Sequence, residues 1–395
     1  MIESWRWYGP LDKIDLSEIA QTRATGIVTA LHEIPYGEVW TVDAIEARLA
    51  LINADPALEL TWNVAESLPI HEDIKRGTGD LDALFANYRQ SLVNMAACGV
   101  KAICYNFMPL LDWTRTTLDA PLKGGGTALR FEAAQMAAFE MFMLKRAGAE
   151  DDYSTEVQAA AAIWFQRSSE AEREVLLSSI MAGLPGAFDR YTVESLREAL
   201  VSYEGIGRSD LRVNYARFLA EIIPTADELG IRMCVHPDDP PRDILGLPRV
   251  VSSGDDIGWI MDQQDSLANG LTLCGGSLGA NPANDVPAIA ARFAERIHFA
   301  HLRNVTKDAD GSFQEAAHLD GDTDMVALIA VLLAEETRRR DAGRTDWEIP
   351  FRPDHGHEML SDLGRDTHPG YPLVGRMVGL AELRGVIAAL KSRTS

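Results

Sequence analysis

The chain has 395 residues, of which 46% are hydrophobic, and 59 acidic against 37 basic side chains give a net charge of −22. This charge argues against a nucleic-acid partner, because phosphate backbones require a positive surface. A local arginine or metal ion still admits a small anionic substrate. The four cysteines form no CxxC pair, and the longest apolar run, 326–334, is too short to span a bilayer. We therefore expect a cytoplasmic protein with no nucleic-acid or membrane partner.

Short β-rich runs alternate with segments of helical periodicity along the chain. Alternating strands and helices predict a parallel sheet, and eight strands in this length predict a closed (β/α)8 TIM barrel. The alternative, an open doubly wound sheet, is disfavoured because no GxGxxG motif follows any predicted strand. The eight predicted strands are residues 26–31, 58–66, 100–107, 230–237, 249–254, 270–276, 296–304 and 347–354.

One predicted connection is too long for a single crossover helix. It runs from Phe107, at the end of the third predicted strand, to Gly230. Strong helical patterns within it predict an inserted helical subdomain at about residues 140–215, after the third strand. In a barrel such an insertion belongs at the C-terminal rim, over the active site. We expect residues 1–395 to form one TIM-barrel domain.

Four strand ends carry side chains that can bind a metal ion. Side chains alternate along a strand, and this parity places His236, Cys274, His301 and Asp354 at the C-terminal ends of four predicted strands. Each residue alone is more often structural than functional. Together, at the rim where barrel enzymes keep their chemistry, they predict a mononuclear metal site. Two imidazoles, a thiolate and a carboxylate permit Zn, Fe(II), Co or Mn, whereas Cys234 is expected in the core.

Seven motifs spread over the whole chain resemble the mannonate dehydratase family. That family has a barrel related in fold to xylose isomerase, in agreement with the predicted alternation of strands and helices. The motifs are RWYGP (6–10), GEVW (37–40), CYNFMPLLDWTRT (104–116), HPDDPP (236–241), HLRNV (301–305), HLDGDTDM (318–325) and RPDHG (352–356).

The resemblance implies a reaction and a metal. The reaction is the dehydration of D-mannonate to 2-keto-3-deoxy-D-gluconate in hexuronate (glucuronate) catabolism, with a proton leaving C2 and hydroxide leaving C3. The family's ligands, a His, a Cys, a His and an Asp in chain order, match His236, Cys274, His301 and Asp354. The usual metal is Mn2+, with Fe2+ or another divalent ion possible. A chelated divalent ion would stabilise the charge that develops on the substrate.

The resemblance also implies an acid–base pair, His355 and Tyr371, without deciding which residue is the acid. The alternative roles are that His355 only orients Asp354 and that Tyr371 only closes the rim. Arg352 shares the ligand face and is expected to bind the substrate carboxylate. Further candidates for contacts to substrate are Asn106, Arg303, Asn304 and His318.

Two other functions remain open at this point. A metal-dependent sugar or sugar-acid isomerase or epimerase of the xylose isomerase-like barrels would use the same rim without expelling water. A non-catalytic sugar-acid binding protein would retain the pocket and lack turnover. Whichever function holds, we expect the protein to form a homo-oligomer, a dimer or a tetramer.

Overall fold

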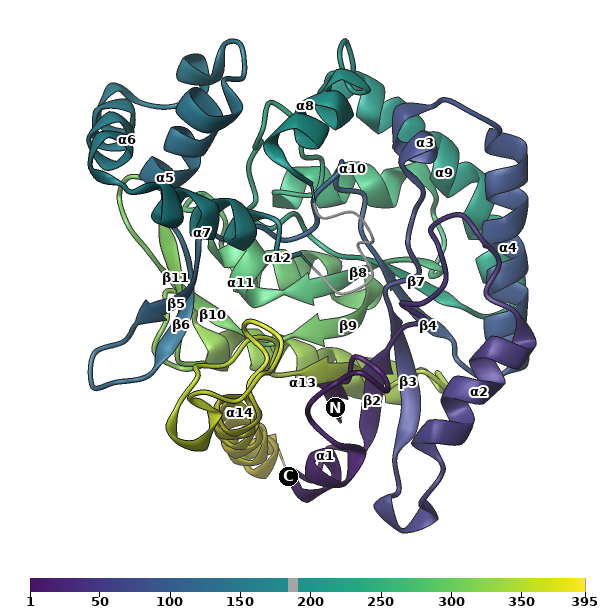
Figure 1. Cartoon of the computed structure of the whole chain (residues 1–395). Helices are drawn as coiled ribbons and strands as arrows, with labels where there is room; N and C mark the ends of the chain where they lie inside the picture. Colours follow the sequence, from purple (N-terminus) through teal and green to yellow (C-terminus); the bar gives the residue numbers. More distant parts are fainter. Residues whose placement is uncertain (184–190, 395) are drawn as a thin grey trace.

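A closed parallel barrel forms the centre of the protein in the computed structural model, which describes residues 1–183 and 191–394 (Figure 1). Its strands are hydrogen-bonded in the order β1-β12-β9-β8-β7-β4-β3-β2. The predicted (β/α)8 barrel is thus confirmed. The strands are β1 (Ile2–Arg6), β2 (Gly26–Thr29), β3 (Thr61–Glu66), β4 (Ala102–Tyr105), β7 (Arg232–Val235), β8 (Asn269–Cys274), β9 (Ile297–His301) and β12 (Pro350–Arg352).

Two of the strand assignments differ from the prediction. Residues 249–254 are not a strand: the run of β-branched residues is held as bends, because Asp238 exchanges hydrogen bonds with the Val251 backbone. The eighth strand is instead β1 at the N-terminus, where Ser4 and Arg6 interrupt the apolar pattern although both are buried. As a result the long insertion follows β4, the fourth barrel strand, rather than the third.

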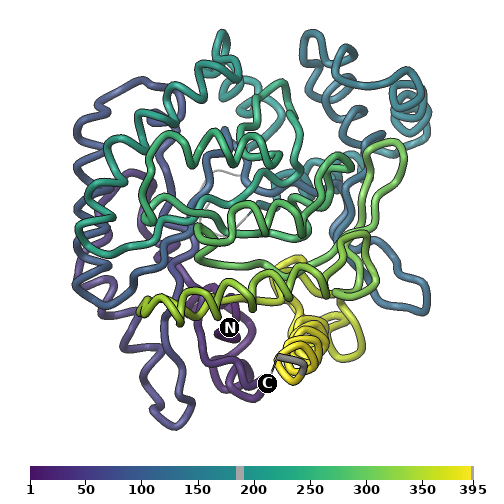
Figure 2. Tube along the Cα trace, turned by 180° about the vertical axis from the view of Figure 1, so that it is seen from behind, coloured from purple at the N-terminus to yellow at the C-terminus, as the bar shows by residue number. Residues whose placement is uncertain are grey.

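Helices surround the barrel and bury their apolar faces against it (Figure 1). Several begin at side chains that cap the helix, such as Thr41, Ser253 and Asp324, each accepting a hydrogen bond from a backbone N–H of the first turn. The last helix lies beside the N-terminal part of the chain, where Arg384 forms an ion pair with Glu3 (Figure 2). The outer helices are α1 (Leu16–Gln21), α2 (Val42–Ile52), α3 (Glu72–Arg76), α4 (Leu81–Ala97), α9 (Arg208–Glu228), α10 (Gly254–Gln263), α12 (Val286–Phe293), α13 (Met325–Asp341) and α14 (Leu373–Thr394).

A second, smaller unit of structure has its own hydrophobic cluster beside the barrel. It contains a four-stranded antiparallel sheet in the order β10-β11-β6-β5, which the sequence did not predict. Its strands come from two separate loops, β5 (Thr117–Pro121) with β6 (Thr127–Phe131), and β10 (Asn304–Lys307) with β11 (Phe313–Ala316). The helices of the unit are α5 (Ala133–Ala138), α6 (Thr155–Arg167), α7 (Glu170–Ile180) and α8 (Val193–Val201).

No helix within the described residues is both long enough and apolar enough to cross a membrane.

Candidate active site and metal centre

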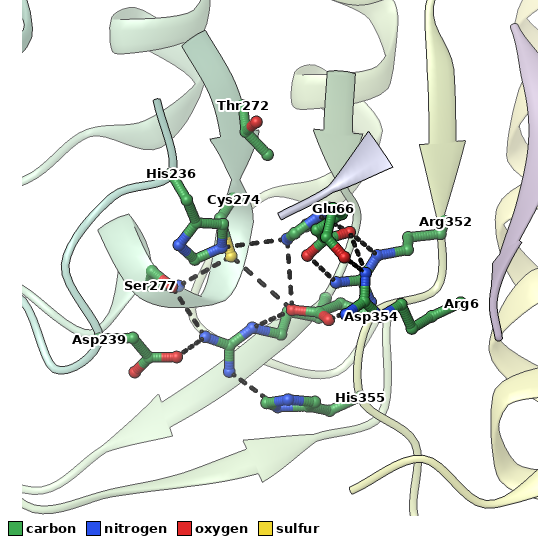
Figure 3. A network of polar contacts seen from close by, with 12 residues as sticks. Arg6, Glu66, His236, Asp239, Thr272, Cys274, Ser277, Arg352, Asp354 and His355 are labelled. Carbon is green, nitrogen blue, oxygen red and sulfur yellow. Dashed lines mark hydrogen bonds and ion pairs between the residues drawn. The ribbon is translucent and has the colours of Figure 1, made fainter. Parts of the chain in front are cut away.

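Three of the four predicted metal ligands lie together at the C-terminal rim. Figure 3 shows two of them, His236 and Cys274, side by side. His236 follows β7, Cys274 ends β8 and His301 ends β9, and their ligand atoms all lie within 4.8 Å of one another. Cys274 and His301 are direct partners in the parallel register of β8 and β9. This pairing explains why the alternation of side chains along each strand was enough to predict that these two residues lie together. We call these three residues the ligand cluster.

Asp354, the fourth predicted ligand, adjoins this cluster. Its Oδ2 atom lies 3.6 Å from His301 Nδ1 and 3.9 Å from Cys274 Sγ. The same carboxylate forms ion pairs with Arg303, at 2.9 Å, and with Arg352, and it accepts a hydrogen bond from the Tyr371 hydroxyl at 3.3 Å. Asp354 is therefore positioned by two arginines at the edge of the ligand cluster.

The charges of the ligand cluster favour metal binding. Burial alone would raise the pKa of Cys274, but Arg303 and hydrogen bonds with His236 and His301 hold that pKa well below its usual value. Burial alone would lower the pKa of His236, but Cys274, Glu66 and Asp354 raise it to about 9. These charges favour the thiolate form of Cys274, which is the form of cysteine that binds metals, and a bound cation would compete with a proton for His236.

The donor set fits a divalent metal ion. His301 directs Nδ1 towards the ligand cluster, 3.1 Å from His236 Nε2, while its Nε2 faces Glu66 Oε2 at 3.4 Å. A thiolate with two imidazoles and a nearby carboxylate suits borderline metals such as Zn2+, Fe2+ and Co2+, and the carboxylate also suits Mn2+. The residues present therefore agree with the metal site that the sequence predicted.

Glu66 is a site residue that the sequence reasoning missed. It ends β3, is buried, and accepts hydrogen bonds from Arg352 Nη2 at 2.7 Å and Nε at 3.1 Å. Burial would raise its pKa, but Arg352, His301 and Arg6 hold it well below its usual value. Its position as an acidic residue at the end of a barrel strand was the signal that could have identified it.

Arg352 is already paired within the protein. Two of its nitrogens contact Glu66 and the third contacts Asp354, so its guanidinium makes no additional ion pair with the described residues. Arg6 lies on the other side of Glu66 and donates to its backbone oxygen. The expected contact of Arg352 with a substrate carboxylate stays a prediction.

His355 lies beside the ligand cluster in a network of charges. Its Nδ1 lies 3.0 Å from Glu315 Oε1 and 3.3 Å from Arg303 Nη1. Burial would raise the pKa of Glu315, but Arg303, His355 and Arg115 lower it to about 2. Gly356, the next residue, allows close packing of the chain, because a Cβ there would lie 2.6 Å from the backbone nitrogen of Arg376.

Two cavities open beside this network. A narrow cavity of about 20 Å³ is lined by Asp354, His355, Tyr371, His236 and Arg352, among others. A wide cavity of about 460 Å³ lies next to it, over the ends of β2, β3 and β4. Three residues line both: Ser67, Asn106 and Asp112.

Three of the predicted substrate contacts line neither cavity. Asn304 uses its side chain to hold a turn, donating to the backbone oxygens of His318 and Thr323 at 3.1 and 2.9 Å. His318 packs against Gly379 of α14, and burial lowers its pKa to about 4. Arg303 lies behind the ligand cluster and binds Asp239 and Glu315. Only Asn106 lies at the cavity surface.

The fold defines the class of the protein as a TIM barrel with a metal-capable rim. A solved structure of a D-tagatose 3-epimerase-like protein aligns with it at a TM-score of 0.51 and 9% identity, covering 100% of both chains, and supports the fold alone.

The D-mannonate dehydratase (UxuA) family model matches residues 1–395. The chain is 54% identical over 393 residues to mannonate dehydratase of Chromohalobacter salexigens, covering 99% of both chains. It is 50% identical to mannonate dehydratase of Marinomonas sp., covering 99% of this chain and 100% of the relative. The crystal structure of mannonate dehydratase from Streptococcus suis serotype 2 aligns at a TM-score of 0.77 and 33% identity, covering 100% of this chain and 96% of that one. The chain belongs to the mannonate dehydratase family, as its motifs indicated.

Proposed function

We propose that this protein removes water from D-mannonate to give 2-keto-3-deoxy-D-gluconate, and that the reaction requires a divalent metal ion. Membership of the mannonate dehydratase family supports the reaction. The single structural observation that carries the metal requirement is the ligand cluster of His236, Cys274 and His301 at the barrel rim. This activity would place the protein in hexuronate catabolism.

The metal would be held by the ligand cluster together with Asp354. Mn2+ is our first choice, with Fe2+ or another divalent ion as alternatives, because the mixed donor set does not select one of them. When bound, the ion would supply Lewis-acid stabilisation for the charge that develops beside the substrate carboxylate. Arg303 and Arg352 would keep Asp354 in place as a ligand.

His355 and Tyr371 would exchange protons with the substrate. Both line the narrow cavity with Asp354, and their rings lie 5.1 Å apart in an edge-on arrangement. Burial, followed by the charge of Asp354, raises the pKa of Tyr371 well above its usual value, which keeps a proton on its hydroxyl. Tyr371 would give that proton to the hydroxide that leaves C3, because hydroxide is a stronger base than a tyrosinate. His355 would then take the C2 proton through Nε2, because Nδ1 is bound by Glu315.

Substrate contacts would come from the residues at the cavity surface. Asn106 lines both cavities and is the best-placed of the predicted contacts. Arg352 would meet the substrate carboxylate only by exchanging one of its present partners, Glu66 or Asp354. Arg303, Asn304 and His318 would act by supporting the loops around the site.

The insertion after β4 would cover the substrate. Met181, Gly183 and Tyr191, from the segment between α7 and α8, line the wide cavity, and this supports a cover over the rim within one domain. The helical part of this proposal corresponds to the predicted region of about 140–215. A cytoplasmic location and a homo-oligomer, a dimer or tetramer, remain predictions.

A product assay tests the proposal. Protein stripped of metal and reloaded with Mn2+ should convert D-mannonate to a keto-deoxy acid, whereas the stripped protein should not. A product that keeps all its oxygen atoms would indicate an isomerase or epimerase instead. Binding without turnover at any metal loading would indicate a sugar-acid binding protein.

A further inference from the structure

Asp112 is an acidic residue at the cavities that the proposed mechanism does not use. It lies in the loop that follows β4, and it lines both the narrow and the wide cavity. Its carboxylate is therefore located at the junction between the space beside the ligand cluster and the larger space over the rim.

The backbone on both sides of Asp112 is firmly held. Arg249 Nη1 donates to the Leu111 carbonyl at 3.1 Å, and the Thr114 N–H donates to the Asp239 carbonyl at 3.0 Å. Arg115 is also fixed, by a buried ion pair with Asp239 at 2.7 Å. The backbone that carries Asp112 is thus held in place, which limits the region that its side chain can reach.

The carboxylate itself has no donor within residues 1–183 and 191–394. Neither a hydrogen bond nor an ion pair reaches it there, and charged groups act on it only through space. Burial raises its pKa, as does Glu66, while His236, Lys75 and Arg249 oppose the rise. Asp112 is partly exposed at the cavity surface, so a ligand hydroxyl that enters the cavity can reach its carboxylate and donate a hydrogen bond to it.

Charges of both signs line the two cavities. In the wide cavity, Arg6 and Lys75 are already paired, with Glu66 and Glu72. The narrow cavity is lined by His236 and Arg352 together with three carboxylates besides that of Asp112, and a metal held by the ligand cluster would add positive charge there. Asp112 presents negative charge on the side of the wide cavity, where it would repel a substrate carboxylate and accept hydrogen bonds from hydroxyls.

We propose that Asp112 binds the polyol tail of the substrate, accepting hydrogen bonds from hydroxyls at C4 to C6, and so determines which end of an aldonic acid reaches the ligand cluster. This inference rests on the proposed function, because it takes the substrate to be an aldonic acid with its carboxylate at the metal. It makes Asp112 a residue that determines specificity for chain length.

Two ligands that cannot lose water allow binding of the tail to be measured separately from binding of the reacting end. A 3-deoxyhexonate keeps the hydroxyls at C4 to C6, whereas 2-hydroxybutanoate keeps only the carboxylate and the C2 hydroxyl. Binding to the Mn2+-loaded protein can be measured by calorimetry. Asp112→Asn should weaken the binding of 3-deoxyhexonate by about tenfold or more, because the hydrogen bonds from its tail to a charged carboxylate are lost. The binding of 2-hydroxybutanoate, which has no such tail, should weaken by less than about twofold. Asp112→Ser should show the same pattern.

Asp119→Asn provides the matched control, because Asp119 is exposed in β5 and lines neither cavity. An equal loss for both ligands would overturn the inference and assign Asp112 to the reacting end or to the fold. No loss for either ligand would overturn it as well. These binding constants do not depend on turnover, so a wild-type protein that binds both ligands and makes no keto-deoxy product would refute the proposed function separately.

Discussion

The two halves of the barrel rim are built differently. The half formed by β7, β8, β9 and β12 carries the ligand cluster and Asp354, joined by buried ion pairs around a cavity of about 20 Å³. The half formed by β1 to β4 adds Glu66 to that network. It also surrounds a cavity of about 460 Å³ with apolar residues such as Leu31, Ile34 and Met108 and with polar residues such as Asn106.

The difference teaches how one rim can serve two tasks. Buried, mutually paired charges fix the positions of their atoms, which reactions with proton transfer require. The wider space is lined by apolar and polar residues alike, and its apolar part accommodates a substrate while discriminating weakly by itself. We therefore expect large effects on chemistry from substitutions in the β7–β12 half, and modest effects on binding from the apolar residues of the wide cavity.

The largest effect should come from Cys274→Ala. Removing a ligand should lower metal affinity by more than about 100-fold, beyond the usual loss for an outer-shell contact, and should abolish turnover with it. Cys234→Ala is the matched control, because Cys234 is buried inside the barrel among Val28, Val64, Cys104 and Phe299. Metal analysis and kinetics on both variants provide the measurement. Metal loss in Cys234→Ala with retention in Cys274→Ala would show that the rim assignment is wrong.

His355→Asn should separate proton transfer from metal binding. We expect full metal content and a kcat lower by roughly a hundredfold, the usual loss for an acid–base group. Asp354→Asn should lose metal as well as activity, because its carboxylate adjoins the ligand cluster. A His355→Asn variant that turns over mannonate at the parent rate would leave His355 as a structural neighbour of Asp354.

The charged half should also control stability in acid. The pKa of Glu315 is lowered to about 2 from its ordinary 4.5, so its ion pairs stabilise the fold above about pH 4.5, and this contribution is lost as pH falls from 4.5 towards 2. The shift corresponds to about 3 kcal/mol in the free energy of unfolding. Urea unfolding at several pH values should show that the Glu315→Gln variant has a lower free energy of unfolding than the wild-type protein at pH 7. On acidification, the variant should lose less of that free energy than the wild-type protein does. Glu46→Gln, at an exposed position, is the control. If the stability of Glu315→Gln depended on pH in the same way as that of the control and the wild-type protein, this role of Glu315 would be contradicted.

The smallest effect should come from the wide cavity. Ile34 is half-buried and lines it without touching the ligand cluster. Ile34→Ala should raise KM by less than about fivefold through lost apolar contact, with metal content and kcat unchanged. Steady-state kinetics measure this directly. A drop in kcat comparable to that of His355→Asn would remove the distinction between the two halves.

Local patterns in the sequence were sufficient for the barrel and for the ligand cluster. Strand parity located His236, Cys274 and His301 because neighbouring parallel strands align their ends. The strand predicted at 249–254 was wrong because Asp238, distant in sequence, bonds the Val251 backbone. The sheet of β5, β6, β10 and β11 was missed because it joins segments far apart in the chain.

Side-chain partners were harder to predict than positions. Glu66 and Arg352 are far apart in sequence, yet two hydrogen bonds join them, and no spacing rule identifies such a pair. Asn304 and His318 were selected as polar residues near a ligand, but their surroundings are a turn and a helix. Whether a polar residue faces a cavity or the backbone depends on tertiary packing.

The central claim is that the thiolate of Cys274 binds the ion that the reaction needs. Metal-free protein can be titrated with Co2+ while the thiolate-to-cobalt charge-transfer absorption and keto-deoxy product formation from D-mannonate are followed on the same samples. We predict that both rise in parallel and reach their maximum at one ion per chain. Full turnover in the metal-free protein, or turnover that reaches its maximum without the charge-transfer absorption, would contradict the claim.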